Sequence, residues 1–120
     1  MNQADFACFH SPYNKLVQKS YGRLLFNDFR RSPDSPEFAS VQAYRDVSLE
    51  ETYDSREIHK AFLGLSKMSY QEKVVPTTKL PVELGNIYTA SLYSCLASLI
   101  DSQGPSLVSN AIETSSLYTR

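Results

Sequence analysis

The residue in this sequence best placed to do chemistry is His10, which lies between a short apolar run and the start of a helix. The run at residues 5–9 predicts a strand. Ser11 suits the N-cap of the helix, because its hydroxyl can accept a hydrogen bond from a free backbone N–H, and Pro12 suits the first helical position. An imidazole beside the positive end of a helix can act on an anion or a polarised carbonyl. His10 is therefore a candidate catalytic residue, and a structural histidine is the alternative.

Two lysines form a cationic row along the same predicted helix, which should span residues 12–29. Lys15 and Lys19 are four residues apart and share one helix face, and Arg23 continues the row. The opposite, buried face is expected to hold Leu16, Val17, Ser20, Leu24 and Leu25. A ligand that reacts near His10 and carries phosphates further along would fit this layout. The alternative is an ordinary solvated face, which is the usual meaning of such a row.

Asn86 is the second candidate, because it introduces the longest apolar stretch of the chain at residues 87–100. Small residues are scattered through this stretch, which predicts a buried helix that neighbours can approach closely. As its N-cap, Asn86 could direct its amide at a ligand oxygen, and a simple structural cap is the alternative. We expect His10 and Asn86 to meet where their two helices begin.

These candidates belong to motifs that resemble hydroxymethylglutaryl-CoA synthase, the enzyme family that condenses acetyl-CoA with acetoacetyl-CoA. The motif at residues 9–13 reads FHSPY and is followed by KLVQK at residues 15–19, which is close to the family's histidine motif. The sequence GNIYTASLY at residues 85–93 matches a second family motif. LLFNDF at residues 24–29 and EETY at residues 50–53 are also similar to the family. The resemblance covers roughly residues 5–99.

The resemblance implies an acyltransferase of the mevalonate pathway, which leads to isoprenoids and sterols. It implies that His10 holds and polarises the acetoacetyl group, while Lys15 and Lys19 contact CoA and Asn86 contacts the acyl group. The expected ligands are acetoacetyl-CoA and acetyl-CoA as substrates, with no cofactor and no metal. The implied fold is α/β, here a partial thiolase-like fold in a helix-rich piece with few strands. We expect a homodimer or an association with a full-length subunit.

The sequence also departs from the family pattern. The family's nucleophilic cysteine and catalytic glutamate precede the histidine motif, and neither Cys8 nor Cys95 occupies the nucleophile position. Cys8 alternates with His10 and could share its side of the strand, whereas Cys95 is expected in the core. We divide the chain into a partial synthase domain at residues 1–105 and a polar, divergent tail at residues 106–120. The tail is expected to be loosely ordered.

Three interpretations remain open at this point. In the first, the chain is part of a hydroxymethylglutaryl-CoA synthase and is inactive alone. In the second, it is a non-catalytic remnant that binds CoA or pairs with another subunit. In the third, it is an unrelated small helical protein. For the first two, large apolar surfaces predict marginal stability or aggregation of the isolated chain.

Composition restricts the classes of function. The chain has 120 residues and a formal net charge of −1, which argues against a nucleic-acid-binding protein. Its two cysteines form no metal-binding or disulfide pattern and suit a reducing compartment. No stretch is long and apolar enough to predict a membrane span, and the first residues do not resemble a signal peptide. A cytoplasmic location is therefore expected.

The remaining segments are expected to support these residues. Residues 30–47 contain two prolines and predict an exposed loop, and Ser48 and Glu51 have the spacing of a capping box for a short helix. A longer helix should follow to about residue 73, with an inner face formed by Ile58, Ala61, Phe62, Leu65 and Met68. His59 is interpreted as a surface histidine. Residues 74–84 contain two further prolines and predict irregular structure with a short extended piece at residues 77–79.

Overall fold

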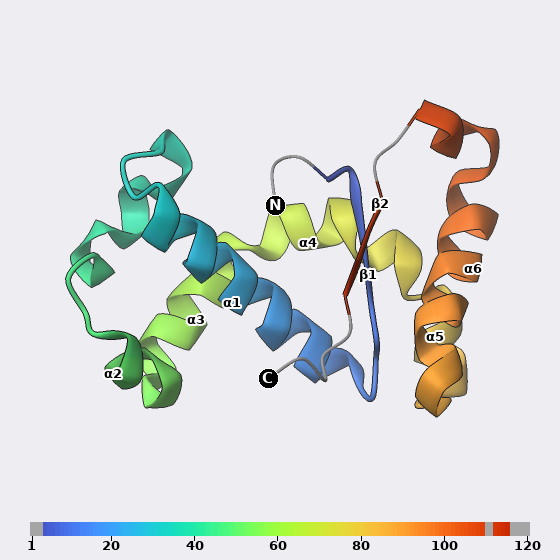
Figure 1. Ribbon diagram of the computed structural model, residues 1–120, viewed down its shortest axis with the longest axis horizontal. Helices are drawn as coiled ribbons and strands as arrows, with labels where there is room; N and C mark the ends of the chain where they lie inside the picture. Colours follow the sequence, from blue (N-terminus) through green and yellow to red (C-terminus); the bar gives the residue numbers. More distant parts are fainter. Residues whose placement is uncertain (1–3, 110–111, 116–120) are drawn as a thin grey trace.

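The computed structural model describes residues 4–109 and 112–115 and is built around one buried strand. Strand β1 (Phe6–Phe9) is buried at all four positions, as expected for a strand that is covered on both faces. Figure 1 shows it between helices on one side and, on the other, the pair formed by α5 (Lys79–Leu84) and α6 (Ser91–Gln103). The strand predicted at residues 5–9 is therefore confirmed.

Alternate side chains of β1 belong to two different hydrophobic clusters. Ala7 and Phe9 pack with residues of α1 (Asn14–Arg31) and α4 (Lys67–Lys73), and the ring of Phe9 meets Tyr21 edge-on with centroids 6.2 Å apart. Phe6 and Cys8 pack with residues of α6 (Ser91–Gln103). Because successive side chains of a strand point to opposite faces, β1 packs against one layer of helices on each side.

A second strand lies beside β1. Strand β2 (Ile112–Ser115) pairs with it in parallel, and Phe6 lies opposite Ile112. The segment η4 (Gly104–Ser109), a 3₁₀ helix, leads toward it. The described part of the predicted tail therefore has regular structure, and the expectation of a loosely ordered tail is wrong there. The sequence of β2 is polar and shows no clear alternation of apolar and polar residues, so it does not predict a strand. The segment is a strand because it pairs with β1.

Side chains from other elements donate hydrogen bonds to backbone carbonyls along the β1 segment. The hydroxyl of Thr77 donates to Ala7 O at 3.3 Å, and the thiol of Cys95 donates to Phe9 O at 3.0 Å. These bonds attach the strand to the segment η2 (Val75–Thr77) and to α6. Buried carbonyls need such partners, so the bonds help to fix the helices around the strand.

Helix α1 begins two residues later than the sequence predicts. Its N-cap is Tyr13, which makes no side-chain capping bond, and Ser11 is buried at 2 % exposure instead of capping. The interpretation of Ser11 as N-cap and Pro12 as the first helical residue is therefore wrong. The chain uses residues 10–13 to turn away from the buried strand, and burial of Ser11 takes precedence over its capping preference.

The segment predicted as an exposed loop contributes to the core. It forms η1 (Pro36–Tyr44), a 3₁₀ helix in which Phe38 and Val41 are buried. The ring of Phe38 meets that of Phe29 at 5.5 Å, within a cluster that also includes residues of α1 and α3 (Arg56–Leu65). The prolines exclude an α-helix here, but they do not prevent a tight segment from burying two apolar anchors.

The capping box at Ser48 is confirmed, whereas the long helix after it is not. Ser48 accepts a hydrogen bond from Glu51 N, and its own N–H donates to the Glu51 carboxylate, at the start of α2 (Leu49–Asp54). The predicted helix to residue 73 is divided into α3 and α4 at Ser66, whose hydroxyl donates to Leu63 O. The break rotates Met68 out of the core, and it is 72 % exposed.

The proline-containing connection is also more helical than predicted. In place of an extended piece at residues 77–79, it forms η2 and then α5 (Lys79–Leu84). Pro81 lies in the first turn of α5, where a missing N–H removes no helical hydrogen bond. Another short 3₁₀ segment, η3 (Tyr88–Ala90), precedes α6. Within the described residues, no helix is both long and apolar enough to span a membrane.

Candidate functional site

His10 lies directly after β1 and is 5 % exposed. Its position is fixed by the buried strand before it and by α1, which begins four residues later. Helix α6 is attached to the same point, because its Cys95 thiol donates to the carbonyl of Phe9. His10 thus lies where β1, α1 and α6 meet. The sequence predicts its position between the strand and α1, but it does not predict the proximity of α6.

Asn86 lies in an exposed loop before η3 and does not cap α6. Its side-chain oxygen accepts a hydrogen bond from Tyr88 N at 2.9 Å. Tyr88 has a φ of 53°, in the left-handed region that is uncommon for a residue other than glycine, so the Asn86 bond supports a strained turn. Helix α6 begins at Ser91 after Ala90, which makes no side-chain cap. The N-cap interpretation of Asn86 is therefore wrong.

The structure brings the surroundings of His10 and Asn86 to the same end of the molecule. In Figure 1, β1 ends and α6 begins at the lower edge of the view, and α6 packs on β1. The hydroxyl of Ser91 accepts from Ile87 N at 3.4 Å, which holds the loop that contains Asn86 against the start of α6. His10 is buried and Asn86 is exposed in this arrangement. Their meeting around a substrate stays a prediction.

Lys15 and Lys19 are both exposed on α1, whereas Arg23 has a different role from the one its spacing suggests. The Arg23 guanidinium donates to Thr52 Oγ1 at 3.0 Å and lies over the ring of Tyr53, 4.5 Å from its centroid. A second ring, that of Phe26, lies 4.7 Å away. Arg23 therefore fastens α2 to α1, and the solvated cationic row consists of the two lysines.

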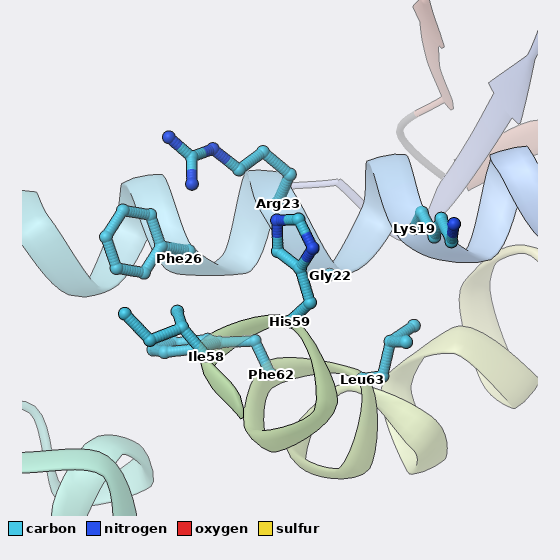
Figure 2. A pocket seen from close by; sticks show the side chains of 8 residues that line it. All are labelled: Lys19, Gly22, Arg23, Phe26, Ile58, His59, Phe62 and Leu63. Atoms are coloured by element: carbon cyan, nitrogen blue, oxygen red, sulfur yellow. The ribbon is translucent and has the colours of Figure 1, made fainter. Parts of the chain in front are cut away.

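A small pocket lies between α1 and α3, and Figure 2 shows the His59 side chain reaching toward α1 between Arg23 and Lys19. Its volume is about 30 Å³, which leaves room for only about two water molecules. A wider hollow of about 290 Å³ lies between α1 and α4, lined in part by Gln18 and Lys67. Neither hollow includes His10 or Asn86. His59 is half-buried, so its interpretation as a plain surface histidine is incomplete.

Both cysteines lie in the core beside α6 and β1. Burial, with a smaller effect of Cys95, raises the pKa of the Cys8 thiol to about 11. Burial likewise raises the pKa of the Cys95 thiol to about 11, although its bond to Phe9 O opposes the change. Thiols of this kind stay protonated at neutral pH, whereas nucleophilic cysteines have a lowered pKa. The expectation that Cys95 is a core residue is confirmed, and Cys8 is equally part of the core.

Asn14 is a polar residue that the sequence interpretation overlooked. It is the first residue of α1, and its side-chain oxygen is shielded from solvent without a hydrogen-bond donor in the described part of the chain. A buried acceptor of this kind costs about 1–3 kcal/mol unless a donor reaches it. The sequence predicts that the helix begins at Pro12, and a helix with that start would make Asn14 an ordinary interior residue. Only the later start of α1 places Asn14 at the first helical position.

Comparison with known proteins identifies the family. A family profile described as "Hydroxymethylglutaryl-coenzyme A synthase C terminal" matches residues 1–117. The chain belongs to the hydroxymethylglutaryl-CoA synthase family. The match continues past residue 105, so it includes most of the residues that the sequence interpretation set apart as a tail.

Individual relatives agree with this assignment. Hydroxymethylglutaryl-CoA synthase A of Dictyostelium discoideum is 48 % identical over 114 residues, which are 95 % of this chain and 24 % of that protein. The cytoplasmic hydroxymethylglutaryl-CoA synthase of Gallus gallus is 42 % identical over 109 residues, which are 88 % of this chain and 21 % of that protein. The chain thus spans about a quarter or less of the length of these curated relatives.

Proposed function

We propose that this chain is the part of a hydroxymethylglutaryl-CoA synthase that holds acetoacetyl-CoA for condensation with an acetyl group. The observation that carries the proposal is the position of His10 at the end of a buried strand, next to α6 and to the helix that carries two exposed lysines. A shielded imidazole can polarise a thioester carbonyl, because water does not screen the interaction.

In this proposal each of these residues contacts a different part of acetoacetyl-CoA. His10 polarises the carbonyl that is attacked, while Lys15 and Lys19 bind phosphates of CoA as point charges along one face of α1. Asn86 contacts the acyl group from the loop before α6, after a small movement releases its amide from the turn at Tyr88. The helices and strands would form part of a thiolase-like arrangement.

We further propose that these 120 residues do not complete the reaction alone. Condensation requires an acetylated thiolate and a base that removes a proton from the acetyl group. Cys8 and Cys95 are buried and have a raised pKa, which opposes their ionisation. The chain would therefore supply one side of the site. The second candidate function, a subunit that binds CoA without turnover, has the same binding properties.

Titration calorimetry with acetoacetyl-CoA tests the holding role. The double variant Lys15→Ala/Lys19→Ala should weaken binding about 5- to 30-fold, because each exposed lysine–phosphate pair contributes about 0.5–1 kcal/mol. Lys60→Ala/Lys67→Ala is the matched control, since it removes two exposed charges from α3 and α4 and should bind normally. Equal loss in both double variants, or no binding by the unaltered chain, would refute the proposal.

Turnover separates the two candidate functions. The isolated chain should produce no free CoA from acetyl-CoA and acetoacetyl-CoA. If the isolated chain forms product and His10→Asn abolishes that activity, these residues are a complete enzyme. The proposal that the chain supplies only one side of the site would then be wrong. If a longer family member that lacks its own copy of this segment regains activity on addition of the chain, the synthase role holds over the purely binding one.

A further inference from the structure

His59 lies on α3, but its side chain reaches the cationic side of α1. Figure 2 shows the imidazole between the side chains of Arg23 and Lys19, over the small hollow that the two helices share. The ring is half-buried, and it makes no hydrogen bond or ion pair within the described part of the chain. An imidazole always has at least one N–H to donate, so His59 offers a donor beside two cations.

The two cations come from successive turns of α1. Lys19 and Arg23 are four residues apart, which is roughly 6 Å along the helix axis. Arg23 is held in place by the rings of Phe26 and Tyr53, and both of its hydrogen bonds to Thr52 come from Nη1. A guanidinium has several other N–H donors, so Arg23 can fasten α2 and still present charge and donors at the hollow.

The surroundings of this cluster favour a negatively charged ligand. No Asp or Glu is among the described residues that line the hollow, and its apolar wall includes Gly22, Phe62 and Leu63. Glu57 is the one acidic residue of α3, and it accepts a hydrogen bond from the Tyr44 hydroxyl of η1 at 3.0 Å. Because a low-dielectric wall focuses the field of nearby charges, an anion at the mouth of the hollow meets a positive potential that no lining carboxylate cancels.

The position of the cluster along α1 indicates which phosphate of the ligand it meets. His10 lies just before α1, Lys15 lies in its first turn, and the hollow begins one turn further on, at Lys19. In acetoacetyl-CoA the groups follow the same order, because the thioester comes first, then the pyrophosphate, and then the 3′-phosphate on the ribose. A phosphate monoester carries close to two negative charges and offers three acceptor oxygens, so it can accept from several donors at once.

We infer that His59, together with Lys19 and Arg23, binds the 3′-phosphate of CoA and so distinguishes CoA thioesters from their 3′-dephospho forms. This inference rests on the proposed function, since it assigns one end of the same ligand. The hollow is too small for a phosphate group at about 30 Å³, so the phosphate lies at its mouth, where Lys19 and His59 approach from different helices. Lys19 is a flexible point charge, whereas α3 fixes the imidazole, so His59 determines the specificity.

Titration calorimetry of the full chain with acetoacetyl-CoA and with its 3′-dephospho form tests the inference. We expect acetoacetyl-CoA to bind roughly 5- to 15-fold more tightly, because each contact between an exposed cation and the phosphate is weak and only a few are made. His59→Ala should reduce this preference to roughly 2- to 4-fold and leave the affinity for the dephospho form unchanged. His59→Lys restores a cation and should retain the preference.

Lys60→Ala is the matched control for His59→Ala. Lys60 is the exposed cation next to His59 on α3, and it does not line the hollow, so its removal should keep the full preference for acetoacetyl-CoA. Far-ultraviolet circular dichroism confirms that each variant is folded. A preference lost equally in His59→Ala and Lys60→Ala would reflect net charge alone and would overturn the inference.

Nitrogen-15 chemical shifts of the His59 ring report the contact directly. Saturation with acetoacetyl-CoA should shift the ring nitrogens, whereas saturation with the 3′-dephospho form should leave them in place. If His59 serves only in the packing of α3 on α1, the ring responds to neither ligand or equally to both, and the inference is wrong.

The two ligands also separate this inference from the proposed function. Equal affinity of the unaltered chain for both ligands overturns the inference alone and leaves the proposed function standing, as does a full preference that persists in His59→Ala. Absence of binding by either ligand overturns the proposed function, and the assignment of His59 fails with it.

Discussion

Arg23 provides the sharpest test of the structure, because its sequence spacing and its contacts predict opposite results for one substitution. The spacing places it in a solvated row after Lys15 and Lys19, where Arg23→Lys would change little. The structure instead places its guanidinium between the rings of Phe26 and Tyr53 and within 3.0 Å of Thr52 Oγ1. A lysine keeps the charge but cannot stack flat or reproduce this fork of donors.

The expected size of the effect follows from these contacts. Each cation–π contact contributes about 0.5–1 kcal/mol, and a hydrogen bond from a charged donor contributes about 1.5–3 kcal/mol. Because the contacts share one side chain and are only partly buried, we expect Arg23→Lys to lower the free energy of unfolding by about 2–3 kcal/mol. Tyr53→Leu removes one ring only and should cost about 0.5–1 kcal/mol.

Urea unfolding followed by circular dichroism measures these differences. Lys19→Arg is the matched control, because it exchanges the same two residue types one turn earlier on α1, at an exposed position, and should change stability by less than 0.5 kcal/mol. If Arg23→Lys is also within 0.5 kcal/mol of the unaltered chain, Arg23 belongs to the solvated row and the attachment of α2 through it is wrong.

Three further predictions concern the core, a helix cap and the thiols. Phe38→Ala should lower the free energy of unfolding by about 3–4 kcal/mol in the same urea assay, because a fully buried ring is removed, whereas Ser40→Ala in the same segment should be neutral. Ser48→Ala should cost about 1 kcal/mol through loss of the capping box, and Ser48→Asp should restore most of it. The thiol pKa values of about 11 exceed the usual value near 9, so the folded state favours protonated Cys8 and Cys95, and this stabilisation is complete below pH 9 and lost as pH rises toward 11. Unfolding measured between pH 8 and 11 should show a fall of roughly 1–3 kcal/mol per thiol, and a Cys8→Ala/Cys95→Ala variant with the same slope would contradict this cause.

The sequence alone determined features that depend on neighbouring residues. The buried strand at residues 6–9 follows from an uninterrupted apolar run, and the start of α2 follows from the spacing of Ser48 and Glu51. The motifs around His10 and Asn86 were sufficient to recognise the family that the comparisons identify. These signals are local, so folding of the rest of the chain does not alter them.

Only the tertiary structure decided where long-range partners override local preference. Ser11 is buried instead of capping, Phe38 turns an expected loop into part of the core, and the break at Ser66 exposes Met68. Strand β2 exists because β1 offers it backbone partners, and Arg23 leaves its row because two rings and a threonine from α1 and α2 surround it. In each case residues distant in sequence supply the deciding contact, which periodicity and capping rules do not contain.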